Sequence, residues 1–77
     1  MEITTANNVR VTTTGNMVVA IDMDTKEAIS IFGATDQTVI QTQGWGGENH
    51  SSVWIKDVEV LMALRDKLNS EIERLTA

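Results

Sequence analysis

The 77-residue chain contains no cysteine and no proline. Without cysteine it can form neither a disulfide framework nor a thiolate metal site, so a small domain of this size depends on its core or on another chain for stability. The lack of cysteine is also typical of a reducing compartment. With no proline, no repeat and no low-complexity run, the sequence offers no linker. Residues 1–77 are therefore expected to form one domain.

Long apolar runs and basic clusters are also missing. The longest apolar run, residues 17–21, is far too short to span a membrane, and the N-terminal residues lack the pattern of a secretory signal. We therefore expect a cytoplasmic protein without membrane contact. Six Lys and Arg residues against eleven Asp and Glu residues give a net charge of −5. Nucleic-acid binding normally requires a basic stripe, and the scattered basic residues here predict no nucleic-acid partner.

Apolar and polar side chains alternate through most of residues 9–56, which is the period of half-buried strands. Within strand 17–23, apolar residues lie on both faces, with Val18 and Ala20 opposite Met17, so this strand is expected to be covered on both sides. Gly15 and Asn16 suit a two-residue hairpin in which glycine takes a positive φ. The pattern predicts strands at 9–12, 17–23, 28–32, 38–42 and 51–56, and leaves residues 1–8 as a loose lead-in or a short edge strand.

The C-terminal residues 57–76 have the pattern of one amphipathic helix. Asp57 is a suitable N-cap, and the residues after it are mostly strong helix formers. Apolar residues recur at steps of three or four along this segment, at Leu61, Leu64, Leu68, Ile72 and Leu75. We therefore predict an α+β fold, an antiparallel β-meander of about four to five strands with the C-terminal helix packed on one face.

Acidic and glycine-rich segments do not match known cofactor sites. If Asp22 opens a calcium loop, its sixth position is Glu27 instead of glycine and its twelfth is Gly33 instead of glutamate, so a turn is expected there. The glycines of residues 44–47 lack the lysine and the spacing of a phosphate-binding loop. We therefore predict neither a metal nor a cofactor.

The single histidine does not form a recognisable catalytic group. Glu48 and His50 provide only two metal ligands, which is an incomplete site. Ser51 would point away from His50 on a strand, and nothing around Ser52 marks a strained nucleophile turn or an oxyanion hole. The sequence therefore predicts that the protein is not an enzyme.

The two tryptophans are the strongest candidates for recognition, because indoles dominate many interfaces. Trp45 is flanked by glycines, and it either folds back over the sheet edge or serves as an exposed anchor. Trp54 is expected to pack in the core or on the second sheet face, beside Val18 and Ala20. The predicted binding segment comprises Trp45, Gly46, Gly47, Glu48, Asn49 and His50. The predicted oligomer interface comprises Val18, Ala20, Trp54, Val60 and Met62.

These patterns favour a small, non-enzymatic protein-binding or regulatory module that forms a homo-oligomer. A short acidic inhibitor encoded by a phage or another mobile element is one example of this class. One alternative is a small-ligand binder with its pocket at a subunit interface near Trp45, His50 and a basic residue. Another is a structural subunit that assembles with itself.

Overall fold

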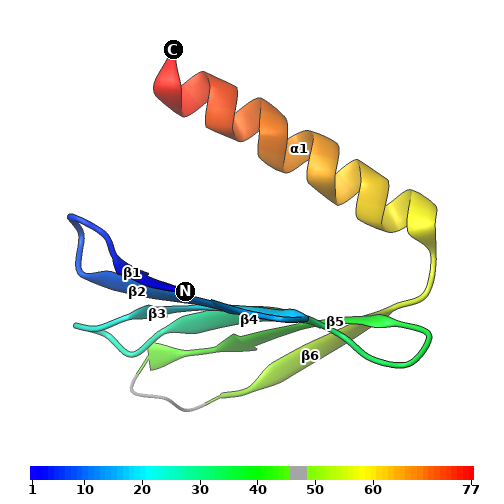
Figure 1. Cartoon of the computed structure of the whole chain (residues 1–77), viewed down its shortest axis with the longest axis horizontal. Coiled ribbons are helices and arrows are strands. Elements are labelled where there is room, and N and C mark those ends of the chain that lie inside the picture. Colours follow the sequence, from blue (N-terminus) through cyan, green and yellow to red (C-terminus); the bar gives the residue numbers. More distant parts are fainter. Residues whose placement is uncertain (46–48) are drawn as a thin grey trace.

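A computed structural model describes residues 1–45 and 49–77, and in these residues it contains one antiparallel sheet followed by one helix (Figure 1). The α+β class, the meander and the C-terminal helix are therefore confirmed. Every strand pairs with its neighbours in sequence order. The elements are β1 (Glu2–Thr4), β2 (Val9–Thr14), β3 (Met17–Asp22), β4 (Ala28–Gly33), β5 (Thr38–Gln43), β6 (Ser51–Ile55) and α1 (Val58–Thr76).

The sheet has six strands, so the prediction of four to five strands is wrong. The additional strand is β1, which pairs with β2 and places Ile3 opposite Val11. The Met1 ammonium group donates to the Thr13 carbonyl at 2.8 Å, and the Thr13 amide donates to the Met1 carbonyl at 2.7 Å. These backbone bonds hold a segment whose polar side chains give little strand signal of their own.

The predicted hairpin turn at Gly15 and Asn16 connects Thr14 to Met17, as expected. However, Gly15 does not occupy the left-handed region, and neither does Asn16, so the prediction of a positive φ is wrong. The Asn16 side-chain amide donates instead to the Gly33 carbonyl at 3.1 Å, and this bond ties the turn to the end of β4.

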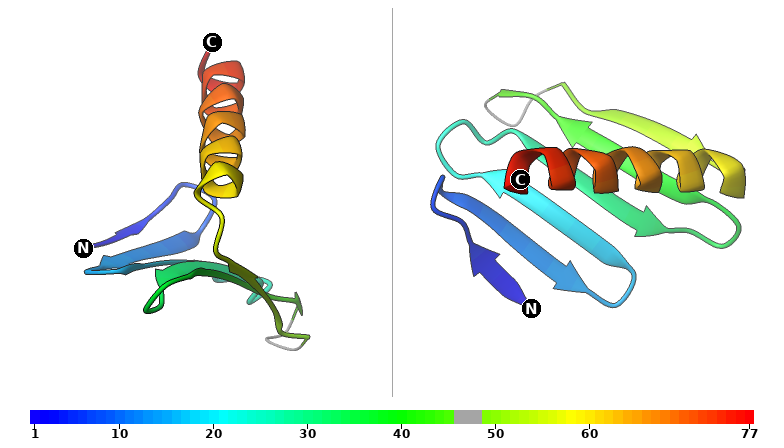
Figure 2. Two further views of the ribbon diagram at one scale, coloured as in Figure 1. Left: turned by 90° about the vertical axis from the view of Figure 1, so that its right-hand side faces the viewer. Right: turned by 90° about the horizontal axis from the view of Figure 1, so that it is seen from above.

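The strand directions show which side chains face the helix. In the right-hand view of Figure 2, the helix lies between the reader and the sheet. An observer on that side who looks along β3 in its chain direction has β4 on the right. The Asp22 amide donates to the Glu27 carbonyl at 2.8 Å, so the backbone groups of Asp22 point toward β4. For an L-amino acid in this orientation, the side chain of Asp22 points toward the helix. Because side chains alternate along a strand, those of Ala20 and Val18 point the same way. By the strand register, the apolar residues of this helix-side face are Ile3, Val9, Val11, Val18, Ala20, Ile29, Ile31, Ile40, Val53 and Ile55.

The opposite surface of the sheet, here called the far face, holds the fully buried part of the core. Its most apolar row runs through Thr14, Met17, Phe32, Val39 and Trp54. Val39 is completely buried, and it is the only residue in this class among those that the structure describes. The packing expected for Trp54 is wrong, because this residue is 60% exposed and lies on the face opposite Val18 and Ala20.

The helix α1 is almost detached from the sheet. Asp57 is its N-cap, as predicted, but the Asp57 side chain makes no capping hydrogen bond. None of the helix residues is buried, and its main strand contact is with β6, which leads into it. Figure 1 shows α1 above the helix-side face and diverging from it toward the C-terminus. The predicted packing of the helix on one face is therefore not observed within the single chain.

The single chain has a larger accessible surface and a larger radius of gyration than a compact domain of the same size. Its accessible surface is 5918 Å², whereas a compact monomer of 8.5 kDa exposes about 4,700 Å². Its radius of gyration is 13.5 Å, against about 11.5 Å for a compact domain of this length. The single chain thus exposes about 1,200 Å² more surface than the scaling law gives for a compact monomer.

Candidate functional site

Trp45 lies at the surface of the protein. Trp45 is 75% exposed, so of the two alternatives, an indole folded over the sheet edge and an exposed indole, the structure shows the exposed one. Asn49 and His50 are exposed too, and Asn49 adopts a left-handed φ of 60°. The predicted binding residues Gly46, Gly47 and Glu48 lie outside the described residues.

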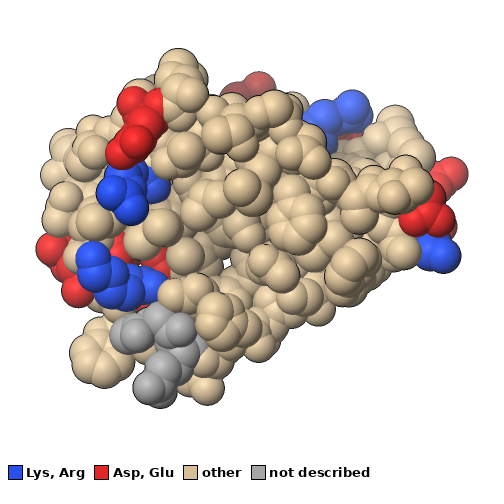
Figure 3. All heavy atoms as spheres, turned by 60° about the horizontal axis from the view of Figure 1, so that its bottom comes forward, with Lys and Arg blue, Asp and Glu red and all other residues tan. Residues whose placement is uncertain are grey.

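The far face carries a hollow of about 540 Å³. Figure 3 views the molecule from this side, where charged side chains lie toward the periphery and uncharged ones occupy the centre. Residues of β3 and β4 form its apolar part, including Val19, Ile21 and Ala28. Three nitrogen-bearing side chains from separate segments of the chain also line the hollow, namely those of Arg10, Lys26 and His50.

The two cations of this hollow are held differently. The Arg10 guanidinium lies 3.7 Å from the Glu2 carboxylate, so its charge is partly balanced. Lys26 adopts a left-handed φ of 66°, a conformation that glycine or asparagine tolerates better than lysine does. The Lys26 amide donates to the Asp22 carbonyl at 2.8 Å, which fixes the tight turn between β3 and β4.

Asp22 organises the same turn through its side chain. The backbone amides of Thr25 and Asp24 donate to Asp22 Oδ1 at 3.1 and 2.9 Å. These bonds hold the pKa of Asp22 below its ordinary value of 3.8, and the nearby Lys26 charge adds to the effect. The turn expected between the second and third predicted strands is therefore confirmed, and the Asp22 side chain stabilises it by accepting from nearby backbone amides.

The helix-side face is an extended apolar surface. One register row joins Val18, Ile31, Ile40 and Val53 across four strands. Of these, Val18, Ile31 and Val53 are between 40% and 58% exposed. A shallow depression of about 510 Å³ reaches the same face beside Val9, Ala20 and Ile29. Contiguous apolar surface of this kind is typical of an interaction site.

The helix exposes a matching apolar stripe. Leu61, near the sheet, is half-buried. Exposure then rises along the helix, from 42% at Leu64 to 58% at Leu68, 59% at Ile72 and 72% at Leu75. This apolar stripe (Leu61, Leu64, Leu68, Ile72 and Leu75) and the helix-side face together form what we call the apolar surface.

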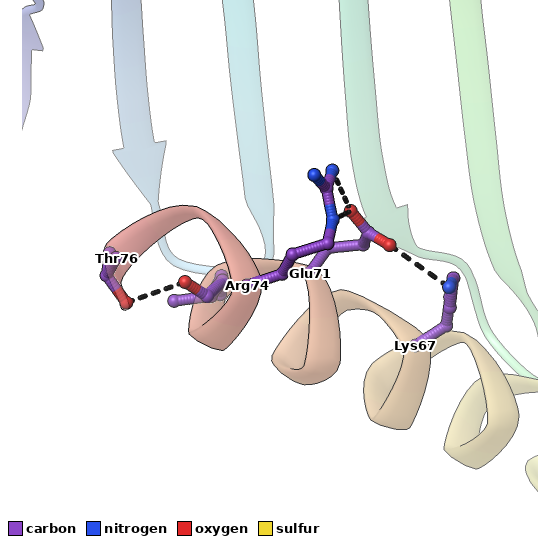
Figure 4. Close-up of polar contacts among 5 residues, drawn as sticks. Lys67, Glu71, Arg74 and Thr76 are labelled. Carbon is purple, nitrogen blue, oxygen red and sulfur yellow. Dashed lines mark hydrogen bonds and ion pairs between the residues drawn. The ribbon is translucent and has the colours of Figure 1, made fainter.

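Beside the stripe, charged residues of the helix pair with one another (Figure 4). Glu71 accepts from Lys67 at 3.0 Å and from Arg74 at 2.6 Å, and the hydrogen bonds from Arg74 and then Lys67 lower the pKa of Glu71. The Thr76 hydroxyl donates to the Ile72 carbonyl at 2.7 Å, near the helix end. The side chains of Lys67, Glu71 and Arg74 on this side of α1 thus find their polar partners within the helix.

The structure separates the residues predicted for an oligomer interface. Val18 and Ala20 belong to the helix-side face, whereas Trp54 belongs to the far face. Val60 and Met62 are 43% and 45% exposed on the helix, away from the main stripe. Sequence reasoning missed the row through Ile31 and Ile40 as a candidate surface. Their alternation was visible, but only the register shows that they join Val18 and Val53.

The described residues contain no group of three or more histidine, cysteine, aspartate or glutamate side chains placed to hold a metal ion. In the same part of the chain, no helix combines the length and apolar character needed to cross a bilayer. No protein-family model matches the sequence, and comparisons with curated proteins and with solved structures found no similar protein.

Proposed function

We propose that this chain is a non-enzymatic protein-binding module and that its apolar surface is the binding site. The observation that carries the proposal is the simultaneous exposure of the apolar stripe and of the helix-side face. A two-layer α+β domain normally buries these two surfaces against each other. Here both remain accessible, so a protein partner that contacts both would complete the missing layer.

The area involved supports a protein partner. Monomeric soluble proteins rarely expose one apolar patch of more than about 300–600 Å². The single chain exceeds the surface of a compact monomer by about 1,200 Å², which is more than the roughly 800 Å² that each partner buries in a standard-size protein–protein interface. The surface is also spread over several strands and a helix, which suits a partner with an extended surface of its own.

A matched pair of substitutions tests this function. Leu68→Glu places a charge in the stripe, and Ser70→Glu adds the same charge elsewhere on the helix, away from the stripe. Native mass spectrometry of the chain isolated with its partner should show a bound protein for the wild type and for Ser70→Glu. Leu68→Glu should lose it. Equal retention by both variants, or a wild-type chain that carries no protein, would refute the proposal.

The far-face hollow favours a second candidate function, the binding of a small organic anion. Arg10, Lys26 and His50 would supply charge and hydrogen bonds, and Val19 and Ile21 would contact the apolar part of the ligand. The volume is within the range of about 300–1,000 Å³ that ligand pockets occupy. Ligand-observed NMR with benzoate should show binding that Lys26→Gly weakens, and equal binding by both proteins would exclude this site.

A further inference from the structure

We infer that the partner is a second copy of this chain, whose α1 lies antiparallel to the first across a two-fold axis near Leu68. This inference rests on the proposed function and specifies its partner. In the resulting dimer, the two apolar stripes meet across the axis, and the sheet of each copy lies beside the C-terminal half of the other copy's helix.

The first argument is the area. Each chain exposes about 1,200 Å² more than a compact monomer of its mass, so pairing two chains accounts for about 2,400 Å². Obligate homodimers bury about 2,000–5,000 Å² in total. One identical partner is therefore enough to bring both chains to normal compactness. The same surface is used twice, as a two-fold interface requires.

The second argument is the spacing of the apolar stripe. From Leu61 to Leu75 the successive steps are three, four, four and three residues, a sequence that reads the same in both directions. When two copies run antiparallel about Leu68, Leu61 lies level with Leu75 of the other copy and Leu64 with its Ile72. Each position of the apolar stripe then meets another stripe position, which suits close packing of two helices.

The third argument is the gradient of exposure along the helix. The N-terminal end of α1 remains near its own sheet, where Leu61 is half-buried, whereas Leu75 at the other end is 72% exposed. An antiparallel second copy brings its own sheet to the end of the helix that lacks cover. A parallel copy would place both sheets at the same end and leave both C-terminal ends uncovered.

Pairing through the sheet edges explains less. Among the residues that the structure describes, no strand pairs with the outer edge of β6, so this edge could add a strand from another chain. Such an extension would leave the stripe and the helix-side face as exposed as before. The apolar surface therefore favours the helix-centred dimer over a continuous sheet.

Single cysteines test this arrangement without interference, because the chain has no cysteine of its own. Under mild oxidation, Leu68→Cys should cross-link to itself, since the two copies of residue 68 meet near the axis. Ser70→Cys, two residues away, is the matched control and should remain monomeric on a denaturing gel. Equal cross-linking of the two variants would overturn the proposed axis.

Two further variants determine the direction of the helices. Leu61→Cys and Leu75→Cys should each fail to cross-link alone and should form a mixed disulfide when they are unfolded, combined and refolded together. Self-cross-linking of Leu61→Cys would contradict the antiparallel arrangement. Far-UV circular dichroism confirms that each variant folds.

The outcome for the dimer is separable from that for the proposed function. Native mass spectrometry of the wild type should give twice the mass of one chain. If the bound protein has a different mass, the chain is a protein-binding module but the second-copy inference is wrong. If no protein is bound and the chain stays monomeric, both are wrong.

Discussion

Val39 and Trp54 are cross-strand neighbours on the far face of the sheet, where Val39 is completely buried and Trp54 is 60% exposed. This pair lies on the side of the sheet turned away from α1. The side that faces the helix contains no fully buried residue among those described. The second layer of the fold is thus incomplete in one chain, and this incompleteness is the basis of the binding function proposed here.

Replacing Val39 tests whether the far face contributes to the stability of the domain. Val39→Ala should lower the free energy of unfolding by about 1.5–3 kcal/mol, because it removes apolar contact from a fully buried site. Thr35→Ala, at an exposed position in the β4–β5 turn, should change it by less than about 0.5 kcal/mol. Urea unfolding of both variants measures the difference, and equal effects would show that Val39 is not a core residue.

Removing the Trp45 indole should leave the fold intact. Because this side chain is 75% exposed, Trp45→Ala should shift the thermal midpoint by no more than a control surface substitution does. The proposed interface does not include Trp45, so the variant should also retain its partner. Loss of stability in a thermal melt would show that the indole is part of the core. Loss of the partner with an intact fold would place the binding site at Trp45.

Lys26 provides a test of backbone strain. Its φ of 66° is costly for a residue with a Cβ atom, by about 1–2 kcal/mol. Lys26→Gly relieves this cost, less the roughly 0.5–1 kcal/mol of extra chain entropy that glycine loses on folding. We expect a net gain of up to about 1.5 kcal/mol in the free energy of unfolding, measured in urea. Glu27→Gly, at the next position and without a positive φ, should instead destabilise the protein.

Asp22 predicts a specific acid dependence. Its folded-state pKa is below 3.8, chiefly because backbone amides donate to its carboxylate. The stabilisation is therefore present above pH 3.8 and is lost as the pH falls below 3.8, through the folded-state pKa. Asp22→Asn should be less stable than the wild type at neutral pH, and the difference should shrink in this acidic window. Because hydrogen bonds dominate the shift, added salt should leave most of the difference in place.

Much of the fold was predictable from local patterns. Period-two alternation located five strands, and the helix pattern after Asp57 gave α1 with the observed residues from Val58 to Thr76. The sequence does not distinguish between a loose lead-in and an edge strand at β1, because this strand contributes one large apolar residue, Ile3, and depends on backbone bonds to β2. Such pairing is a tertiary property that local propensity does not encode.

The candidate surface was less predictable, for a different physical reason. Alternation shows that Trp54 and Val53 face opposite ways, but only the register with β5 shows which of them joins Val18. A shift of one residue would exchange the two faces. The apolar stripe was visible in the sequence, yet its spacing does not show whether its partner lies in the same chain or in another. The exposure of Leu68 and Leu75 shows that the sheet of the same chain does not cover the stripe.

Sedimentation equilibrium of the wild-type chain over a wide concentration range tests the central claim most directly. One chain has a mass of 8.5 kDa. The proposed dimer predicts a species of twice that mass, which Leu68→Glu shifts toward the single chain and Ser70→Glu leaves unchanged. A wild-type protein that remains at the mass of one chain at every concentration would contradict the account.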